Sequence, residues 1–186
     1  MSDAPQTYRQ LRFRRPPGAT EILLVRHGES APANPEEPFP MVEGHSDPPL
    51  DPVGERQAQQ VAARILASGE EIAAIYVTTL QRTHQTAAPL ARALQIEPQV
   101  ERDLREVNLG EWEGGGLFRK HVSEGHPIAL EMARTGRWDV IPGAEPAAEL
   151  EARVRAAISR IADRHPDQTV VVVAHGGVIG QVMALA

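Results

Sequence analysis

Apolar residues occur in short unbroken runs that alternate with longer stretches in which they recur every three or four positions. The runs over 22–25 and 170–174 contain only apolar residues, and the run over 72–77 adds a single tyrosine. Runs of this length are typical of strands that are buried on both faces of a parallel sheet. The run over 170–174 is the richest in β-branched residues, which favour strands. A shorter strand is predicted near 99–104.

The longer stretches predict amphipathic helices. The first helix is expected after Asp51, a residue suited to cap it, with Pro52 at the first helical position. A second helix begins near Gln81, a third surrounds 150–161, and a short one is predicted around 128–134. The inward positions of the three longer helices are Ala58, Val61, Ala62, Ile65 and Leu66, then Ala87, Leu90, Ala91 and Leu94, then Leu150, Val154, Ala157, Ile158 and Ile161.

Strands that alternate with helices predict an α/β fold of three layers, α/β/α, with helices flanking a mainly parallel sheet. We expect a single domain over 21–186, preceded by a loosely ordered lead-in over 1–20. The proline-rich stretch over 31–49 is incompatible with a regular helix or an inner strand. It is therefore predicted to be a surface loop that borders a substrate pocket.

Composition narrows the classes of protein to consider. The 186 residues carry a formal net charge of -6, which argues against nucleic acid or an anionic membrane as the partner. Cysteine is absent, which excludes disulfides, thiolate catalysis and cysteine metal sites. No apolar run approaches the ~20 residues that span a bilayer, and the start lacks the apolar stretch of a secretory signal. The expected compartment is therefore the cytoplasm.

Histidine and arginine follow the ends of the predicted strands. Arg26 and His27 come directly after the first strand, Arg82 follows the second after a short turn, and His175 follows the last. Since ligands bind beyond the carboxyl ends of parallel strands, these side chains are expected to converge on one rim of the sheet.

Such a cluster is suited to phosphoryl transfer. A neutral imidazole can attack phosphorus, and two guanidinium groups can neutralise the phosphoryl oxygens. Gly28, Gly176 and Gly177 would let the backbone approach a bound anion closely. No metal or cofactor is required, because the arginines supply the positive charge.

Five segments, in the same order, resemble the motifs of the histidine phosphatase superfamily, which includes the cofactor-dependent phosphoglycerate mutases. The resemblance covers residues 21–181. The five segments are Leu24–Ser30 (LVRHGES), Asp47–Leu50 with Gly54 and Gln57-Ala58, Leu80–Ala87, Asp103–Glu106 with Gly110–Gly114, and Val173–Ile179.

The resemblance implies a phosphoglycerate mutase-like fold and a role for each residue. His27 is expected to be the nucleophile that forms phosphohistidine. Arg26, Arg82 and His175, with Gly28 and Gly176, would bind the phosphate. Glu106 would be the general acid that protonates the leaving alcohol and then the base that activates water. A raised carboxyl pKa would suit this role near neutral pH.

The mutases of this family resemble one another in a long insertion that is absent here, since only a short stretch separates Gly114 from Gly143. A mutase must keep water from its phosphoenzyme, for which a lid is the expected device. The sequence therefore favours a metal-independent phosphomonoesterase that acts on a small phosphorylated metabolite. Phosphoglycerate mutase-type transfer is the alternative, and a non-catalytic phospholigand or protein-binding module is the alternative of a different class.

Three further observations remain open on the sequence alone. Arg119 belongs either to the pocket or to the surface, and His45 is interpreted as a solvated loop histidine. The chain ends at Ala186, soon after the last motif, whereas family members usually continue with further helix and strand. Either the domain is shortened at its C-terminus, or the protein continues beyond Ala186. A shortened domain would have an unpaired sheet edge that favours a homodimer.

Overall fold

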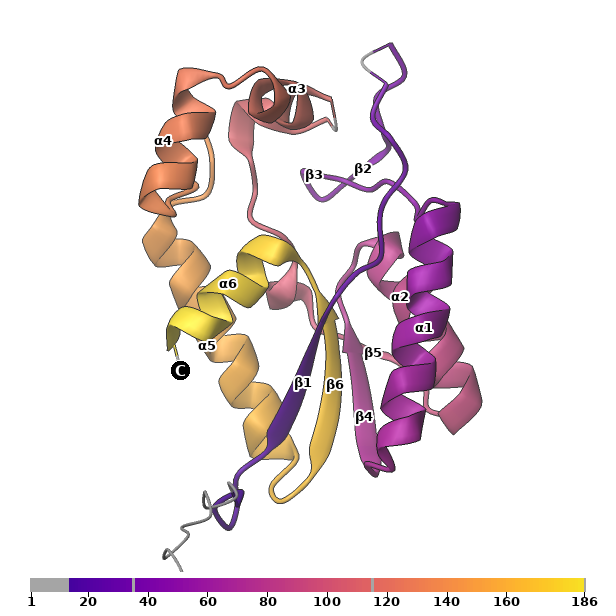
Figure 1. Cartoon of the computed structure of the whole chain (residues 1–186). Helices are drawn as coiled ribbons and strands as arrows, with labels where there is room; N and C mark the ends of the chain where they lie inside the picture. The colour runs from indigo at the N-terminus through magenta and orange to yellow at the C-terminus, as the bar shows by residue number, and fades with distance from the viewer. Residues whose placement is uncertain (1–13, 35, 115, 186) are drawn as a thin grey trace, which may run out of the picture.

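The computed structural model describes residues 14–34, 36–114 and 116–185. Its centre is a four-stranded, fully parallel sheet in the order β1-β6-β4-β5 (Figure 1). The strands are β1 (Glu21–Arg26), β4 (Ile72–Val77), β5 (Gln99–Val100) and β6 (Thr169–Ala174). The last strand of the chain therefore lies in the interior of the sheet, between the first strand and β4.

Helices cover both faces of the sheet, which confirms the predicted three-layer architecture (Figure 1). The helices α1 (Pro52–Ser68) and α2 (Gln81–Leu94) lie on one face, and α5 (Ala147–Arg164) and α6 (Gly176–Leu185) lie on the other. Side chains alternate along β6, so Val170 and Val172 pack toward α5 and α6 whereas Val171 and Val173 pack toward α1 and α2. Because helices cover both faces of β6, each position along its valine run is buried against one of the two helix layers.

The start of α1 follows its local sequence. Asp51 accepts a hydrogen bond from the backbone N–H of Gly54 at 2.8 Å, and Pro52 occupies the first turn, where its missing N–H costs nothing. Gly69 ends the helix in the left-handed conformation that glycine adopts readily. Among the helices of the described residues, none combines the length and the apolarity needed to cross a membrane.

Smaller elements form a cap beyond the carboxyl ends of the strands (Figure 1). The cap contains the hairpin β2 (Met41–Val42) and β3 (His45–Ser46), the 3-10 turn η2 (Gly110–Trp112), α3 (Leu117–Ser123) and α4 (Pro127–Thr135). The hairpin lies in the stretch predicted to be a surface loop, and its two short strands stay outside the main sheet. The short helix predicted over 128–134 is present as α4, whereas α3 was not predicted.

The strand predicted near 99–104 is shorter than expected. Only Gln99 and Val100 pair with β4, and the 3-10 turn η1 (Arg102–Leu104) follows at once. The N–H of Glu101 still donates to the carbonyl oxygen of Val77 on β4 at 2.8 Å. The carboxylate of Glu101 then accepts a hydrogen bond from the N–H of Asp103, and this local cap starts the 3-10 turn.

Candidate active site

His27 lies immediately after β1, at the rim where the strands end. Its Nδ1 lies 2.7 Å from the carbonyl oxygen of Gly28, and its Nε2 lies 3.2 Å from Nε of Arg82. A carbonyl can only accept and a guanidinium can only donate, so Nδ1 carries the proton and Nε2 presents a lone pair. The pKa of His27 is lowered to about 4, mainly by burial and further by the positive charges of Arg82, Arg26 and Arg119. The hydrogen bond to the Gly28 carbonyl acts in the opposite direction and raises the pKa. The imidazole is therefore neutral near pH 7.

The two predicted arginines differ in their surroundings. Arg82, in the first turn of α2, is buried and donates to the carbonyl of Ser46 at 3.0 Å, with Asp47 at 3.8 Å. Arg26 is exposed at the mouth of the same cavity as His27. Both guanidinium groups can therefore reach one phosphoryl group, Arg82 from a fixed position and Arg26 from the solvent side.

His175 follows β6 and is fully buried beside His27, with ring centroids 5.1 Å apart. Its Nε2 shares a 3.0 Å hydrogen bond with the hydroxyl of Thr78, while its buried Nδ1 has no partner among the described residues. Burial, aided by the charge of Arg82, holds the pKa of His175 well below its usual value. The ring supports His27 from behind and does not line the cavity.

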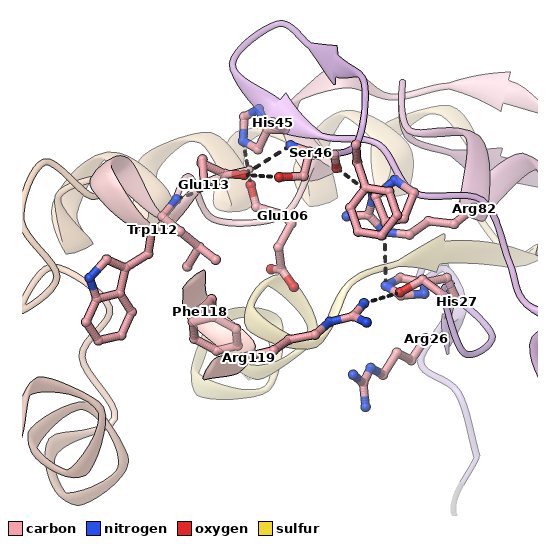
Figure 2. A pocket seen from close by; sticks show the side chains of 14 residues that line it. Arg26, His27, His45, Ser46, Arg82, Glu106, Trp112, Glu113, Phe118 and Arg119 are labelled. Carbon is pink, nitrogen blue, oxygen red and sulfur yellow. Dashed lines mark hydrogen bonds between the residues drawn. The ribbon is translucent and has the colours of Figure 1, made fainter. Parts of the chain in front are cut away.

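Glu106 approaches the same cavity from the opposite wall (Figure 2). Its Oε1 accepts hydrogen bonds from the N–H groups of Val107 at 3.0 Å and Gly177 at 3.1 Å, at the start of α6. Burial raises the pKa of Glu106, although these N–H groups and the charge of Arg82 oppose the shift. The structure thus places a carboxyl with a raised pKa in the cavity that contains a neutral imidazole.

The glycines of the two rim motifs serve close packing. A Cβ at Gly177 would lie 2.6 Å from Oε1 of Glu106, so only glycine leaves room for the carboxylate. A Cβ at Gly28 would lie 2.5 Å from the carbonyl oxygen of Gly54, and the Gly28 N–H is bonded to the Thr86 hydroxyl. Gly28 therefore allows the loop that carries His27 to pack closely against α1. Its own N–H is not free for a ligand, because it donates to Thr86. Gly176 lies beside Arg26, whose Nε would be 3.6 Å from an added Cβ.

The cavity has a volume of about 200 Å³, which suits a small phosphorylated molecule. Predicted site residues and cap residues line it together: Arg26, His27, Arg82, Glu106, Ser30, Phe39, His45, Ser46, Pro48, Leu109, Trp112, Glu113, Phe118 and Arg119. Within the described ranges, no group of three or more histidine, aspartate or glutamate side chains is arranged to hold a metal ion.

Arg119 is a cavity residue, which the sequence left undecided. It lies on α3 and donates to the Ser30 hydroxyl and to the Ala31 carbonyl, each at 2.9 Å, so its guanidinium points toward Arg26 and His27 (Figure 2). The sequence signal for its role was weak because α3 itself was not predicted.

His45 corrects the interpretation of a solvated loop histidine. It is buried, it lines the cavity, and its Nε2 lies 3.0 Å from the carbonyl oxygen of Glu106. The short hairpin places it there, and one carboxylate ties that hairpin to the rest of the cap. Glu113 accepts from the N–H and the hydroxyl of Ser46 and from the N–H of Leu109.

Comparison with known proteins agrees with this geometry. The sequence profile of the histidine phosphatase superfamily (branch 1) matches residues 22–186. Phosphoglycerate mutase-like protein 4 of Arabidopsis thaliana is 39% identical over 162 residues, which cover 86% of this chain and 67% of that protein. Metal-independent phosphoserine phosphatase of the same plant is 34% identical over 163 residues, covering 86% of this chain and 66% of that protein.

Among solved structures, the native structure of a mycobacterial glucosyl-3-phosphoglycerate phosphatase superposes with a TM-score of 0.70 at 26% identity. The match covers 88% of this chain and 77% of the mycobacterial chain. The chain thus shares its fold with a protein named as a phosphatase.

Proposed function

Because the chain belongs to the histidine phosphatase superfamily, we propose that it is a metal-independent phosphomonoesterase with His27 as its nucleophile. One observation carries the proposal: a neutral imidazole with its lone pair on Nε2 shares a cavity with three arginines and a carboxyl of raised pKa. The substrate is a small phosphorylated metabolite, in keeping with the volume of the cavity.

In the first step, Nε2 of His27 attacks phosphorus and the bond from phosphorus to the ester oxygen breaks. When the substrate binds, the N–H of Arg82 that contacts Nε2 of His27 donates to a phosphoryl oxygen instead. The lone pair on Nε2 is then free to attack phosphorus. Arg82 and Arg26 neutralise the phosphoryl oxygens. Glu106 gives its proton to the leaving oxygen, so the product departs as an alcohol.

In the second step, water attacks the phosphohistidine. Glu106, now a carboxylate, takes a proton from the water as the oxygen–phosphorus bond forms and the nitrogen–phosphorus bond breaks. Inorganic phosphate leaves, His27 returns to its neutral form, and Glu106 is again protonated. Every proton moves between groups of this chain, the substrate and water, so the cycle needs no metal ion.

Hydrolysis is favoured over mutase-type transfer by the size of the cap. The cap elements between Gly114 and Gly143 are the two short helices α3 and α4, which offer little chain to close over a phosphoenzyme. Some relatives are named as a phosphoserine phosphatase and a glucosyl-3-phosphoglycerate phosphatase, and others as phosphoglycerate mutase-like, so the choice rests on the cap.

The test is hydrolysis of p-nitrophenyl phosphate in the presence of a chelator, with His27→Ala as the variant. We expect release of phosphate by the wild type and none by the variant, and an acid-labile phosphoenzyme trapped by rapid quenching. Phosphate release that persists in a folded His27→Ala variant would show that another group is the nucleophile. Phosphoryl exchange without net release would indicate a mutase, and neither activity would indicate a binding module.

A further inference from the structure

A single guanidinium holds the chain segment that carries Glu106. Arg153, on α5, does not line the cavity, yet it contacts the backbone of the proposed acid and of the residues just before it. Its five hydrogen bonds go to the carbonyl oxygens of Asp103 (2.6 Å), Arg105 (2.8 Å) and Glu106 (3.1 Å) and to Oε1 (2.6 Å) and Oε2 (2.8 Å) of Glu145.

This arrangement uses properties that only arginine has. The planar fork grips both oxygens of Glu145 and still directs N–H groups at three carbonyl oxygens, which an ammonium group could not do at once. The side chains of Arg153 and Glu145 are only 18% and 12% exposed. Loss of one partner would leave the other charge poorly solvated, so the pair is strongly constrained.

The held segment has little regular structure of its own. After the η1 turn the chain runs through Arg105 to Val107 without helix or strand, so its carbonyl groups need partners from elsewhere. Arg153 supplies partners from the α5 side, and His45 contacts the Glu106 carbonyl from the hairpin side at 3.0 Å. The backbone of Glu106 is thereby fixed between α5 and the cap.

We propose that Arg153 is a positioning residue for proton donation by Glu106, acting through the backbone of residues 103–106. The proposal rests on the proposed function, because it takes Glu106 as the general acid. A displacement of about 1 Å between reacting groups is enough to lower a rate about a hundredfold. Arg153 thus controls the chemical step without touching the substrate.

Substrates with different leaving groups can distinguish a positioning role of Arg153 from a purely structural role. An alkyl phosphate releases a strongly basic alkoxide and depends fully on proton donation, whereas 2,4-dinitrophenyl phosphate releases a stable anion and depends on it little. Misplacement of the acid therefore slows the alkyl ester selectively. A loss of folded protein, or a damaged phosphate pocket, would slow both esters equally.

The experiment compares kcat/KM of Arg153→Gln and Arg153→Lys with wild type on an alkyl phosphate and on 2,4-dinitrophenyl phosphate. We expect a loss of about tenfold or more on the alkyl ester and less than about twofold on the aryl ester. Arg155→Gln is the matched control, because Arg155 lies on the same helix and pairs only with the exposed Glu151 in the described structure. It should behave as wild type on both esters. If Arg153→Gln fails to fold, Arg153→Lys retains the charge and carries the test.

Glu106→Gln separates failure of this proposal from failure of the proposed function. If Glu106→Gln does not slow the alkyl ester selectively, the assignment of Glu106 as the acid is wrong. If it does, but the Arg153 variants slow both esters equally or neither, the positioning role is overturned. If Glu106 is the acid and Arg153 positions it, Arg153→Gln should have little further effect in the Glu106→Gln background, because the two changes remove the same proton transfer.

Discussion

At the scale of single residues, burial gives His27 and Glu106 the protonation states that the proposed chemistry requires. Burial disfavours charge in both, so it lowers the pKa of the histidine to about 4 and raises the pKa of the carboxyl. The same cause thus favours the neutral form of both groups, the free base of His27 and the protonated acid of Glu106.

These shifts predict a bell-shaped dependence of kcat/KM on pH. The rate should rise as His27 loses its proton near pH 4 and should fall at higher pH as Glu106 ionises. Steady-state kinetics over pH 3.5 to 9 with an alkyl phosphate, which depends on proton donation, would measure both limbs, after correction for the substrate's own titration near pH 6. Glu106→Gln should lack the alkaline limb, and an unchanged limb would exclude Glu106 as its origin.

Arg119 gives a second prediction at this scale. Its guanidinium lies at the cavity and contributes to the lowered pKa of His27. Arg119→Ala should lower kcat/KM by about tenfold, since a hydrogen bond to a charged group contributes about 1.5–3 kcal/mol. The acidic limb should also move to higher pH, because a positive charge near His27 is lost. Lys120→Ala, an exposed neighbour on α3, is the control and should change neither quantity.

At the scale of elements, the predictions from sequence succeeded where long patterns or strong caps decide the structure. The apolar runs of β1, β4 and β6 and the Asp51 cap needed no tertiary information. The end of β5 was missed because a local cap formed by Glu101 starts η1 there. The hairpin and α3 were missed because they depend on contacts between distant segments, such as the bonds of Glu113 to Ser46. The residues at the rim could be predicted from the sequence because they directly follow strands. The burial of His45 and the contacts of Arg153 with residues 103–106 could not, because they form only when the cap folds against α5.

The start of α6 supplies a prediction for an element. Gly177→Ala places a Cβ 2.6 Å from the Glu106 carboxylate and should lower kcat by about tenfold or more through displacement of the acid. Gly180→Ala lies on the same helix with nothing within 4 Å of the added Cβ. It should keep full activity and gain up to about 1 kcal/mol of stability from helix propensity. Equal activity of the two variants in the same assay would show that the close contact is not needed.

At the scale of the whole molecule, stability depends on two neutral histidines, His27 in the cavity and His175 buried beside it. His27 and His175 have pKa values below those of the unfolded chain, so the unfolded state binds their protons first as the pH falls. Their contribution is complete above about pH 6.5 and is lost toward pH 4. Glu106 acts in the opposite sense, since its raised pKa contributes stability at low pH that is lost as the pH rises through that value.

The histidine contribution can be measured by urea unfolding between pH 7.5 and 4.5. The wild type should lose stability across this range, with His27 accounting for up to about 3 kcal/mol. His27→Asn should show a clearly shallower loss over the same range. Parallel curves for the two proteins would mean that His27 titrates normally in the folded state.

Association into a homodimer stays a prediction at this scale. In the described sheet β1 is an edge strand that pairs only with β6, so one row of its backbone groups faces away from the sheet. Sedimentation velocity over a hundredfold range of concentration should reveal a concentration-dependent dimer. A single monomeric species at the highest concentration would contradict the prediction.

The position of β6 in the sequence also determines when the sheet and the active site can form during synthesis. His27 leaves the ribosome long before the strand that must lie beside it, because β6 begins only at Thr169 and His175 follows it. At about 5–20 residues per second, β1 waits roughly 10–30 s for its neighbour. During that interval the nascent chain has an unpaired first strand and an incomplete sheet, the kind of exposed surface that chaperones recognise. The site is therefore assembled only when β6 inserts between β1 and β4, two strands that were already made.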